Sequence, residues 1–316
     1  MKPAGVLAIV GATATGKSSL AVSVAEILDG EIISADAFSA YRGLDVGTAK
    51  TTVLERRGIP HHLIDVKDPA EPFSAGEFGS RARQIAEEIL QRGRLPILCG
   101  GSGFYIRSFF GGLFEGPTRD ERLRSALTIV KERRGSAFLK RWVDLYDPEC
   151  GARVNSGDAA RAIRFLEIML TTGRTATELF RERPGVRWEH AAVKVLLTLP
   201  RPVLYERIEN RFQKTFAPEL PGEVRRLLSS GVSLSCPGFS AIGYRETAEL
   251  LEGRMDHREW EELILRGTRR FAKRQETWFR REPGLQVVRA DQPGLVDLVI
   301  AAAQPLFSSG RPVQDK

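Results

Sequence analysis

Residues 11–18 read GATATGKS, and this octapeptide limits the possible folds more than any other feature of the chain. It fits the pattern G-x-x-x-x-G-K-[ST], in which backbone N–H groups of a glycine-rich loop surround phosphate oxygens and the lysine neutralises their charge. A short apolar run, VLAIV (6–10), precedes it, and Leu20, Val24 and Leu28 recur at helical spacing after it. Because an incidental glycine-rich turn would lack these flanks, the segment predicts a strand, a phosphate-binding loop and a helix.

Four further apolar segments, at 31–36, 61–66, 95–101 and 193–199, have the length of buried strands. Ser74 and Glu77 have the spacing of a capping box, which predicts a helix that continues to about residue 93. Strands that alternate with helices of this length are typical of a parallel sheet covered on both faces. We therefore predict an α/β fold, with a parallel sheet like that of P-loop NTPases flanked by helices.

The pattern changes between residues 117 and 185, where helical segments follow one another without intervening strands. We interpret this stretch as an all-helical insertion in a core made of residues 1–116 and 186–316. Beyond the strand at 193–199 the core is mostly helical, and a long helix is expected from about His257 to Arg281.

The chain has 316 residues and a net charge of +7, and this surplus is concentrated near its C-terminal end. Residues 266–281, RGTRRFAKRQETWFRR, contain seven Lys or Arg against one Glu. Clustered cations with aromatic residues between them indicate a polyanionic partner such as nucleic acid. The alternative is a solvated helix face.

The three cysteines, Cys99, Cys150 and Cys236, form neither a disulfide framework nor a metal-binding pattern, and Cys99 is expected in the core. The apolar run at the start is too short for a signal peptide, and no stretch reaches the roughly 20 apolar residues of a membrane span. We therefore expect a cytoplasmic protein that is neither exported nor embedded in a membrane.

The motifs that usually accompany a phosphate-binding loop in nucleotide-binding proteins are mostly missing here. There is no N-K-x-D motif for guanine, and the segment at 95–101 ends in glycines instead of aspartate. The nearest carboxylates at strand ends are Asp36 and Asp65. Asp36 could order Mg²⁺ or act as a base, although taken alone it would be read as a turn residue.

Several other motifs follow GATATGKS in order along the chain. They are SADAFSAYRGLDVGTAK (34–50), GIPHHLID (58–65), GGSGFYIR (100–107), NSGDAARAIRFLE (155–167), YERIENRF (205–212), AIGYRE (241–246) and TRRFAKRQETWFR (268–280). Together the motifs span residues 6 to 281 and resemble those of the tRNA dimethylallyltransferases, also called tRNA isopentenyltransferases. The resemblance implies transfer of a dimethylallyl group from dimethylallyl diphosphate to N6 of the adenosine just 3′ of the anticodon, position 37, with release of diphosphate.

By this resemblance the loop holds the diphosphate of the prenyl donor, and not the β and γ phosphates of ATP. Lys17 and Arg211 would stabilise the charge that grows on the leaving diphosphate, and Ser102 would lie near its bridging oxygen. Asp36 matches the base that accepts the N6 proton as the carbon–nitrogen bond forms. Mg²⁺ is expected on Ser18. The implied diphosphate-binding residues are Gly11, Thr13, Ala14, Thr15, Gly16, Lys17, Ser18 and Arg211. Taken without the resemblance, Arg211 could be a surface charge and Ser102 a helix N-cap.

The resemblance also implies contacts with the anticodon stem-loop of tRNA, including contacts from the helical insertion. Trp278 is one heptad from Phe271, a spacing that favours a core position over a stacking platform. His61 and His62 have no further ligands at suitable spacing, so we expect them to order a strand end and not to bind a metal. The implied tRNA-binding residues are Asp36, Ala37, Phe38, Ser39, Ser102, Arg124, Arg161, Arg164, Gly243, Tyr244, Arg245, Lys273, Arg274, Gln275, Trp278 and Arg280.

The sequence departs from the family pattern at three positions where glutamine is usual, namely Ser39, Ala160 and Ser240. Ser102 stands where threonine is usual, but it keeps a hydroxyl. An amide side chain can read a base edge with paired donor and acceptor groups. We therefore hypothesise an altered or relaxed preference for the bases that flank the target adenosine.

Three rival functions compete with this interpretation. A small-molecule kinase shares the loop and the sheet, but it leaves the basic segment unexplained. An enzyme that prenylates free adenine nucleotides would not need the cations at 273–280. A tRNA-binding protein without catalysis would not need to retain Lys17, Ser18, Asp36 and Arg211. We expect a monomer whose partners are tRNA and dimethylallyl diphosphate.

Overall fold

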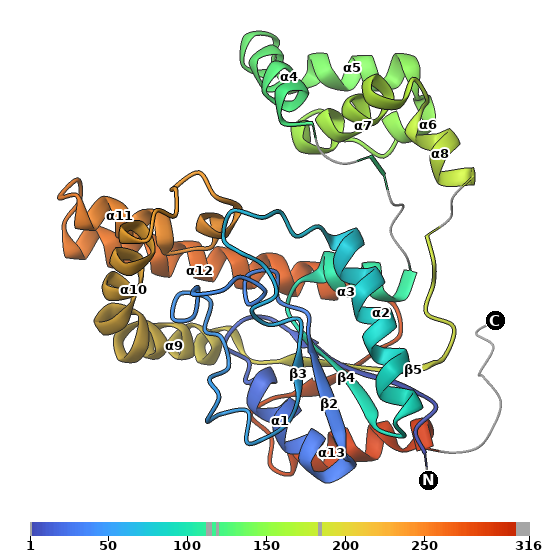
Figure 1. Cartoon of the computed structure of the whole chain (residues 1–316), viewed down its shortest axis with the longest axis vertical. Coiled ribbons are helices and arrows are strands. Elements are labelled where there is room, and N and C mark those ends of the chain that lie inside the picture. The colour runs from blue at the N-terminus through green and yellow to red at the C-terminus, as the bar shows by residue number, and fades with distance from the viewer. Residues whose placement is uncertain (1, 112–115, 118–119, 183–184, 308–316) are drawn as a thin grey trace. The chain divides into compact units, whose positions relative to one another are not determined.

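The computed structural model describes residues 2–111, 116–117, 120–182 and 185–307 (Figure 1). The chain forms two compact units, one made of residues 1–110 and 188–316 and the other of residues 111–187. The second unit interrupts the first, at positions close to the 117 and 185 suggested by the sequence. Within the described residues no helix has both the length and the apolar character needed to cross a bilayer.

The first unit is built on a six-stranded sheet whose strands all run parallel, in the order β3-β2-β4-β1-β5-β6. In this arrangement β1 lies between β4 and β5, with Leu7 opposite both Ile97 and Val193. The loops that follow β2, β4 and β1 therefore leave the same edge of the sheet side by side, which is where parallel α/β sheets bind ligands. The strands are β1 (Gly5–Gly11), β2 (Gly30–Ser34), β3 (His61–His62), β4 (Leu95–Gly100), β5 (Ala191–Thr198) and β6 (Leu285–Arg289).

The buried residues of β1 point alternately to two hydrophobic layers, as the two-residue period of a strand requires. Leu7 and Ile9 pack with helices α1 (Lys17–Leu28) and α13 (Leu295–Ala303), which lie together in Figure 1. Val6, Ala8 and Val10 belong to the opposite layer, which includes α2 (Ala75–Gln91) and α3 (Gly103–Gly111). Because both faces are covered, the predicted α/β class with a helix-flanked parallel sheet is confirmed.

Two strand predictions need correction. The segment 61–66 is extended only at His61–His62, because Leu63 and Asp65 adopt positive φ values of 61° and 56°. The strand β6 was not predicted, since it is a short edge strand that is largely exposed and lacks an apolar run. The predicted helices at 75–93 and 257–281 are confirmed as α2 and α12 (His257–Phe279).

Most helices between β5 and β6 complete the layer that contains α2 and α3, whereas the turn of residues 304–307 packs on the opposite face of the sheet. A π-helical turn joins α9 to α10, and Arg211 is the last residue before it. The elements are α9 (Arg201–Arg211), η1 (Phe212–Phe216), α10 (Ala217–Ser229), η2 (Pro237–Ser240), α11 (Tyr244–Leu251), α12 (His257–Phe279) and η3 (Gln304–Phe307).

A buried carboxylate connects these helices to the loop after β2. Glu223 of α10 accepts hydrogen bonds from the backbone N–H groups of Asp45, Val46 and Gly47, at 3.0, 2.7 and 3.3 Å, and from the hydroxyl of Tyr244 at 2.6 Å. Both Glu223 and Tyr244 are almost fully buried. The four donors compensate the carboxylate for its lost hydration, so this network fixes the course of residues 45–47.

The second unit is all-helical and has its own apolar core, which includes Leu127, Leu139 and Leu166. Its buried Glu167 accepts a hydrogen bond from Asp120 N–H at 2.9 Å and one from Arg164 at 2.8 Å. The helices are α4 (Glu121–Arg134), α5 (Ser136–Tyr146), α6 (Pro148–Gly151), α7 (Ala159–Thr172) and α8 (Ala176–Glu182).

Candidate phosphate-binding site

The loop between β1 and α1 has the backbone conformation of an anion-binding loop. Ala14 and Gly16 adopt positive φ values of 63° and 88°. A Cβ atom on Gly11 would lie 2.5 Å from the carbonyl oxygen of Leu197, so only glycine fits where β1 turns into the loop. Thr15 closes the turn by donating its hydroxyl to the carbonyl of Ala12 at 2.8 Å.

The first turn of α1 leaves backbone N–H groups available to an anion. The first hydrogen bond recorded into this helix runs from Leu20 N–H to the carbonyl of Gly16, at 3.2 Å. The amides of Lys17, Ser18 and Ser19 precede it and have no helical partners. Together with the helix dipole they favour a negatively charged group at this end of α1.

Lys17 places its ammonium group at the inner side of the loop, where Nζ donates to the carbonyl of Ala12 at 2.6 Å. Burial lowers the pKa of Lys17 from 10.5 to about 8; the neighbouring Arg211 adds to this effect, and the carboxylate of Asp36 acts against it. A desolvated cation next to a second cation is a strong attractor for an anion. Binding of a phosphate group would therefore stabilise the protonated form of Lys17.

Arg211 reaches the same loop from the end of α9, although 198 residues separate it from Thr13. Its Nη2 donates to Thr13 Oγ1 at 2.9 Å, and its guanidinium lies over the ring of Phe216 at 5.3 Å from the centroid. Burial lowers the pKa of Arg211, and the carboxylate of Asp36 acts in the opposite direction. Arg211 therefore contacts the phosphate-binding loop directly and is not a simple surface charge.

Asp36 lies just beyond the carboxyl end of β2 and is partly buried. Its Oδ1 accepts hydrogen bonds from the backbone N–H groups of Phe38 and Ser39, at 2.9 and 3.4 Å. No partner is recorded for Oδ2 in the described part of the chain. The carboxylate is thus held by one oxygen and keeps the other for a ligand or a proton.

Ser102 follows β4 and connects its loop to the turn that contains Asp36. Its Oγ accepts a hydrogen bond from Ala37 N–H at 3.0 Å, and its own N–H donates to the carbonyl of Ala35 at 3.2 Å. Ser102 also precedes α3, but its hydroxyl bonds the β2 loop and not a helix N–H. Because that hydroxyl is used as an acceptor, its O–H remains available to donate to a ligand oxygen.

A small cavity adjoins the first turn of α1, and its volume of about 30 Å³ suits one or two water molecules. Burial raises the pKa of the Cys99 thiol, which lines this cavity, to about 11, so the thiol stays neutral at physiological pH. The predicted core position of Cys99 is confirmed. The cavity is lined by Ser18, Ala21, Ile32, Ser34, Thr51, His61, Ile64 and Cys99.

Most of the predicted cations of α12 are exposed. Lys273, Arg274 and Arg280 are open to solvent, and no ion pair is recorded for them in the described part of the chain. Trp278 is partly buried: its ring lies 4.6 Å from that of Phe104, and the guanidinium of Arg107 lies over it at 4.4 Å. Trp278 therefore packs within the unit, which agrees with a core position more than with a stacking platform.

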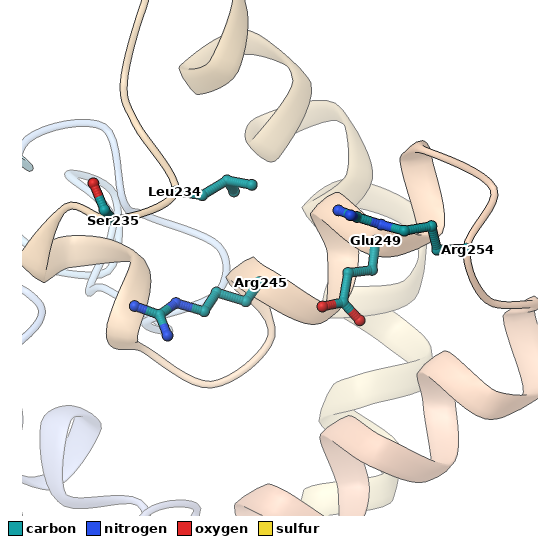
Figure 2. A pocket seen from close by; sticks show the side chains of 5 residues that line it. All are labelled: Leu234, Ser235, Arg245, Glu249 and Arg254. Atoms are coloured by element: carbon teal, nitrogen blue, oxygen red, sulfur yellow. The ribbon is translucent and has the colours of Figure 1, made fainter. Parts of the chain in front are cut away.

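Arg245 lies elsewhere, at an open hollow of about 350 Å³ (Figure 2). Its guanidinium extends from α11, and Glu249 of the same helix stands near Arg254 in the close-up. The lining residues are Leu234, Ser235, Arg245, Glu249 and Arg254, none of which belongs to the phosphate-binding loop. This hollow is open to solvent and is lined by charges of both signs. It shares no lining residue with the phosphate-binding loop.

The structure gives several predicted tRNA-binding side chains internal partners instead. The hydroxyl of Tyr244 is bonded to Glu223, and burial raises the pKa of that hydroxyl. Ser39 is buried, with its hydroxyl 2.8 Å from that of Ser34. Gln275 is also buried and bonds two loops of the sheet edge. These three side chains cannot reach RNA where they lie.

Two arginines of the second unit are similarly engaged. Arg164 donates to Glu167 at 2.8 Å and to the carbonyl of Pro117 at 2.9 Å, while Arg124 lies 3.5 Å from Glu167. Arg161 is exposed, although it donates to the carbonyl of Arg153 at 2.9 Å. Of the three, Arg161 is the most accessible to an external partner.

His61 and His62 each have a partner within the chain. His61 Nδ1 lies 2.8 Å from the carbonyl oxygen of Ile59, and His62 Nε2 lies 2.7 Å from Glu31. Burial lowers the pKa of His61, so it is largely neutral at physiological pH. The contact of His62 with Glu31 joins the short strand β3 to β2, whereas that of His61 is local to the loop before β3.

The structural roles of Glu223 and Lys50 were not predicted from the sequence. Lys50 is buried, and its Nζ donates to the carbonyl of Tyr41 at 2.8 Å, to Asp45 at 2.5 Å and to Asp65 at 2.6 Å. Charged residues that are buried and paired in this way leave no periodic signal. Their placement depends on contacts between distant parts of the chain.

Comparison with known proteins places the chain among tRNA-modifying enzymes. The family described as IPP transferase matches residues 39–282, and the one described as isopentenyl transferase matches residues 4–71. The chain is 44% identical to tRNA dimethylallyltransferase 1 of Trichlorobacter lovleyi over 288 residues, which cover 91% of this chain and 94% of the relative. It is also 44% identical to the tRNA dimethylallyltransferase of Solibacter usitatus, over 88% of this chain and 91% of the relative.

Solved structures agree with this assignment. The crystal structure of the tRNA isopentenylpyrophosphate transferase of Bacillus halodurans superimposes with a TM-score of 0.70 at 34% identity, covering 96% of this chain and 98% of the other. A eukaryotic dimethylallyltransferase acting on tRNA superimposes with a TM-score of 0.80 at 23% identity, covering 99% of this chain and 81% of the other. At that identity the second match shows a common fold.

Proposed function

The chain belongs to the tRNA dimethylallyltransferase (IPP transferase) family, and from that premise we propose that it transfers the dimethylallyl group of dimethylallyl diphosphate to N6 of adenosine 37 in tRNA. The observation that carries the proposal is the meeting of three loops at one sheet edge. They bring Lys17 and the carboxylate of Asp36 within electrostatic range of each other, and Arg211 reaches the same place from the end of α9. A site for an anionic leaving group thus adjoins a site for a proton.

The donor's diphosphate lies in the loop 11–18, surrounded by the amides of the first turn of α1. Lys17 and Arg211 stabilise the negative charge that develops as the bond between C1 and the bridging oxygen breaks. The Ser102 hydroxyl, whose lone pair already accepts from Ala37, donates to that oxygen. Thr13 contributes indirectly, because its hydroxyl accepts from Arg211 and its N–H is bonded to Gln275.

The acceptor nitrogen attacks C1 as the diphosphate departs, so that the C1–N6 bond forms while the C1–O bond breaks. The N6 proton passes to Asp36, whose Oδ1 is fixed by two backbone N–H groups and whose Oδ2 has no hydrogen-bond partner among the described residues. Diphosphate, the prenylated adenosine and a proton on Asp36 are the products. The target base must leave its stack to reach this site, which costs least in a single-stranded loop.

Mg²⁺ fits the oxygen-rich surroundings of the loop. The exposed hydroxyl of Ser18, in the first turn of α1, is the oxygen of this chain that would hold it. Mg²⁺ favours one or two protein oxygens together with phosphate oxygens and water. When bound, it would neutralise part of the diphosphate charge.

The RNA-binding role falls to exposed cations. We assign contacts with the anticodon arm to Lys273, Arg274 and Arg280 in the first unit and to Arg161 in the second, all of which are exposed. Ala37 and Phe38 stay candidates because they lie in the turn beside Asp36 and are partly buried. Because Ser39 is buried against Ser34, the usual amide is replaced by a group that cannot read a base, which supports an altered preference for flanking bases.

One chain supplies all residues that we assign to the donor and to the proton, so we propose that the enzyme works as a monomer. Its three cysteines are free, as suits a reducing compartment such as the cytosol. Size-exclusion chromatography with light scattering at the working concentration tests the monomer. A dimer that dissociates only when activity is lost would contradict it.

The function is tested by mass spectrometry of tRNA nucleosides after incubation of unmodified tRNA with the protein, Mg²⁺ and dimethylallyl diphosphate. We expect one C5H8 unit to be added to adenosine 37. A parallel reaction with ATP tests the kinase alternative, and one with free adenine nucleotides tests the nucleotide prenyltransferase. Transfer in either parallel reaction, with no addition to tRNA, would overturn the proposal.

The preference for flanking bases is tested with anticodon stem-loops in which each base beside adenosine 37 is changed in turn. We expect the relative kcat/KM values to vary less than for a family member with glutamine at the position of Ser39. An identical profile would rule out the altered preference.

A further inference from the structure

Gln275 of α12 makes two hydrogen bonds that join two loops of the sheet edge. Its Oε1 accepts from Thr13 N–H at 2.8 Å, and its Nε2 donates to the carbonyl of Gly101 at 2.9 Å. The side chain is only 6% exposed. One amide group therefore satisfies a donor in the phosphate-binding loop and an acceptor in the loop after β4.

The two glycines around Ser102 make room for this arrangement. A Cβ atom on Gly101 would lie 2.3 Å from Gln275 Nε2, and one on Gly103 would lie 2.2 Å from Trp278 Nε1. Gln275 and Trp278 are three residues apart and so lie on one face of α12. The sequence GGSG is thus shaped to receive this face of the helix, and a side chain at either glycine would force the two apart.

Each of the loops that Gln275 joins carries a different part of the proposed reaction. Thr13 lies in the same loop as Lys17, and its hydroxyl accepts a hydrogen bond from Arg211. Gly101 directly precedes Ser102, which holds the turn of Asp36 through Ala37 N–H. The spacing between the diphosphate cations and the proton acceptor therefore depends on the length and hydrogen bonding of this side chain, in addition to the pairing of β1 with β4.

We propose that Gln275 is a positioning residue that fixes the phosphate-binding loop against the Ser102 loop and so sets the distance between the donor site and Asp36. This inference rests on the proposed function for the meaning of the two sites. It replaces the expectation that Gln275 contacts RNA, because an amide that reads a base edge must have its donor and acceptor free and exposed.

The chemistry of the amide explains why neither an apolar nor an anionic residue would serve. Methionine has a similar length, but it would leave the partly buried Thr13 N–H and the buried Gly101 carbonyl without this partner. Glutamate could still accept from Thr13 N–H, but its second oxygen would face the Gly101 carbonyl, an acceptor, unless it carried a proton. The glutamate variant therefore distinguishes the hydrogen bond to Thr13, which it keeps, from the one to Gly101, which it loses unless it is protonated.

The test compares Gln275→Met and Gln275→Glu with the wild type and with Thr277→Ala, an exposed position on the same helix that has no assigned role. Four quantities are measured: the Kd for dimethylallyl diphosphate without tRNA, the Kd for tRNA at fixed salt, the single-turnover rate and the Tm. For Gln275→Met we expect the donor Kd to rise about tenfold and the rate to fall about tenfold to a hundredfold, with the tRNA Kd changed less than twofold.

For Gln275→Glu we expect a smaller rise in the donor Kd than for Gln275→Met, and a rate that approaches that of the wild type as the pH falls. The reason is that a protonated glutamate can donate to the Gly101 carbonyl. A loss caused only by poorer folding would not show this pH dependence relative to the wild type. Recovery of the rate at low pH therefore supports positioning even if Gln275→Met is too unstable to measure.

Three results would overturn the inference. They are a tRNA Kd that rises while the donor Kd is unchanged, variants that match Thr277→Ala in all four quantities, and a rate ratio of Gln275→Glu to wild type that does not depend on pH. The donor Kd is measured without tRNA, so it reports on Gln275 even if the wild type transfers nothing to tRNA. A wild type that transfers nothing to tRNA would reject the proposed function and not the role of Gln275.

Discussion

Raising the pH from 7 to 9 should weaken the binding of dimethylallyl diphosphate about tenfold, because it removes the proton of Lys17. Burial sets the pKa of this ammonium group at about 8. Lys17 is then protonated in about nine-tenths of the free molecules at pH 7 and in about one-tenth at pH 9, a difference worth about 1.4 kcal/mol of binding free energy. A bound diphosphate raises the pKa of Lys17, so affinity is complete below the free pKa and is lost as the pH rises through it.

Isothermal titration calorimetry without tRNA measures this effect in the absence of turnover. Titrations in two buffers of different ionisation enthalpy, at fixed Mg²⁺, also count the protons bound with the donor. We expect uptake of about half a proton at pH 8 and almost none by Lys17 at pH 6.5.

Lys17→Arg is the matched control, because its guanidinium stays protonated throughout this range. The titration of the diphosphate itself is common to both proteins and cancels in their ratio. A ratio of Kd values that stays constant from pH 7 to 9 would mean that Lys17 does not lose its proton near pH 8 or does not face the diphosphate, and it would contradict this prediction.

Three further predictions follow from the other contacts. Asp36→Asn should lower the single-turnover rate by about 10² to 10⁴ with the tRNA Kd changed less than twofold, because an amide cannot take the N6 proton; a rate near that of the wild type would rule out Asp36 as the base. The double change Lys273→Ala and Arg274→Ala should weaken tRNA binding and reduce the slope of log Kd against log salt by about 1.4 to 1.8, measured by filter binding; an unchanged slope would place the RNA elsewhere. Glu223→Ala should lower the free energy of unfolding in urea by about 3 kcal/mol or more, because it removes the acceptor of the buried Tyr244 hydroxyl and of three backbone N–H groups. Tyr244→Phe removes one donor and should cost about 1 kcal/mol, and equal losses would contradict the network.

Local patterns in the sequence were sufficient to locate the phosphate-binding loop and the sheet that carries it. The loop GATATGKS follows a buried apolar strand and opens a helix, so its period and composition change within a few residues. Asp36 and Ser102 follow strands that the apolar runs also revealed. The structure brings these residues together because neighbouring parallel strands end at one edge.

The contacts that organise the site were beyond such reasoning, because they join residues that are far apart in sequence. Gln275 and Thr13 are 262 residues apart, and Glu223 and Asp45 are 178 apart. Gln275 lies among exposed cations in the sequence, so its burial depends on how α12 packs against GGSG. The edge strand β6 was missed for a related reason, since its exposed residues show no apolar run.

The predicted RNA contacts also show that burial and internal pairing cannot be predicted from a sequence motif. A basic or polar residue in a motif shows neither where its side chain points nor what already binds it. Tyr244 and Ser39 are buried with internal partners, whereas Lys273 and Arg274 are open to solvent. Burial and pairing, which only the three-dimensional structure supplies, separate the two groups.

The proposed reaction depends on a prenyl diphosphate that occupies the loop while the carboxylate of Asp36 faces the attacking amine. The most direct measurement is a crystal structure of the protein with an unreactive thio analogue of the donor and an anticodon stem-loop. We expect the diphosphate within hydrogen-bonding distance of Lys17 and Arg211, and N6 of the extruded adenosine within hydrogen-bonding distance of Asp36. A diphosphate bound away from the loop, or an adenosine whose N6 points away from Asp36, would contradict this expectation.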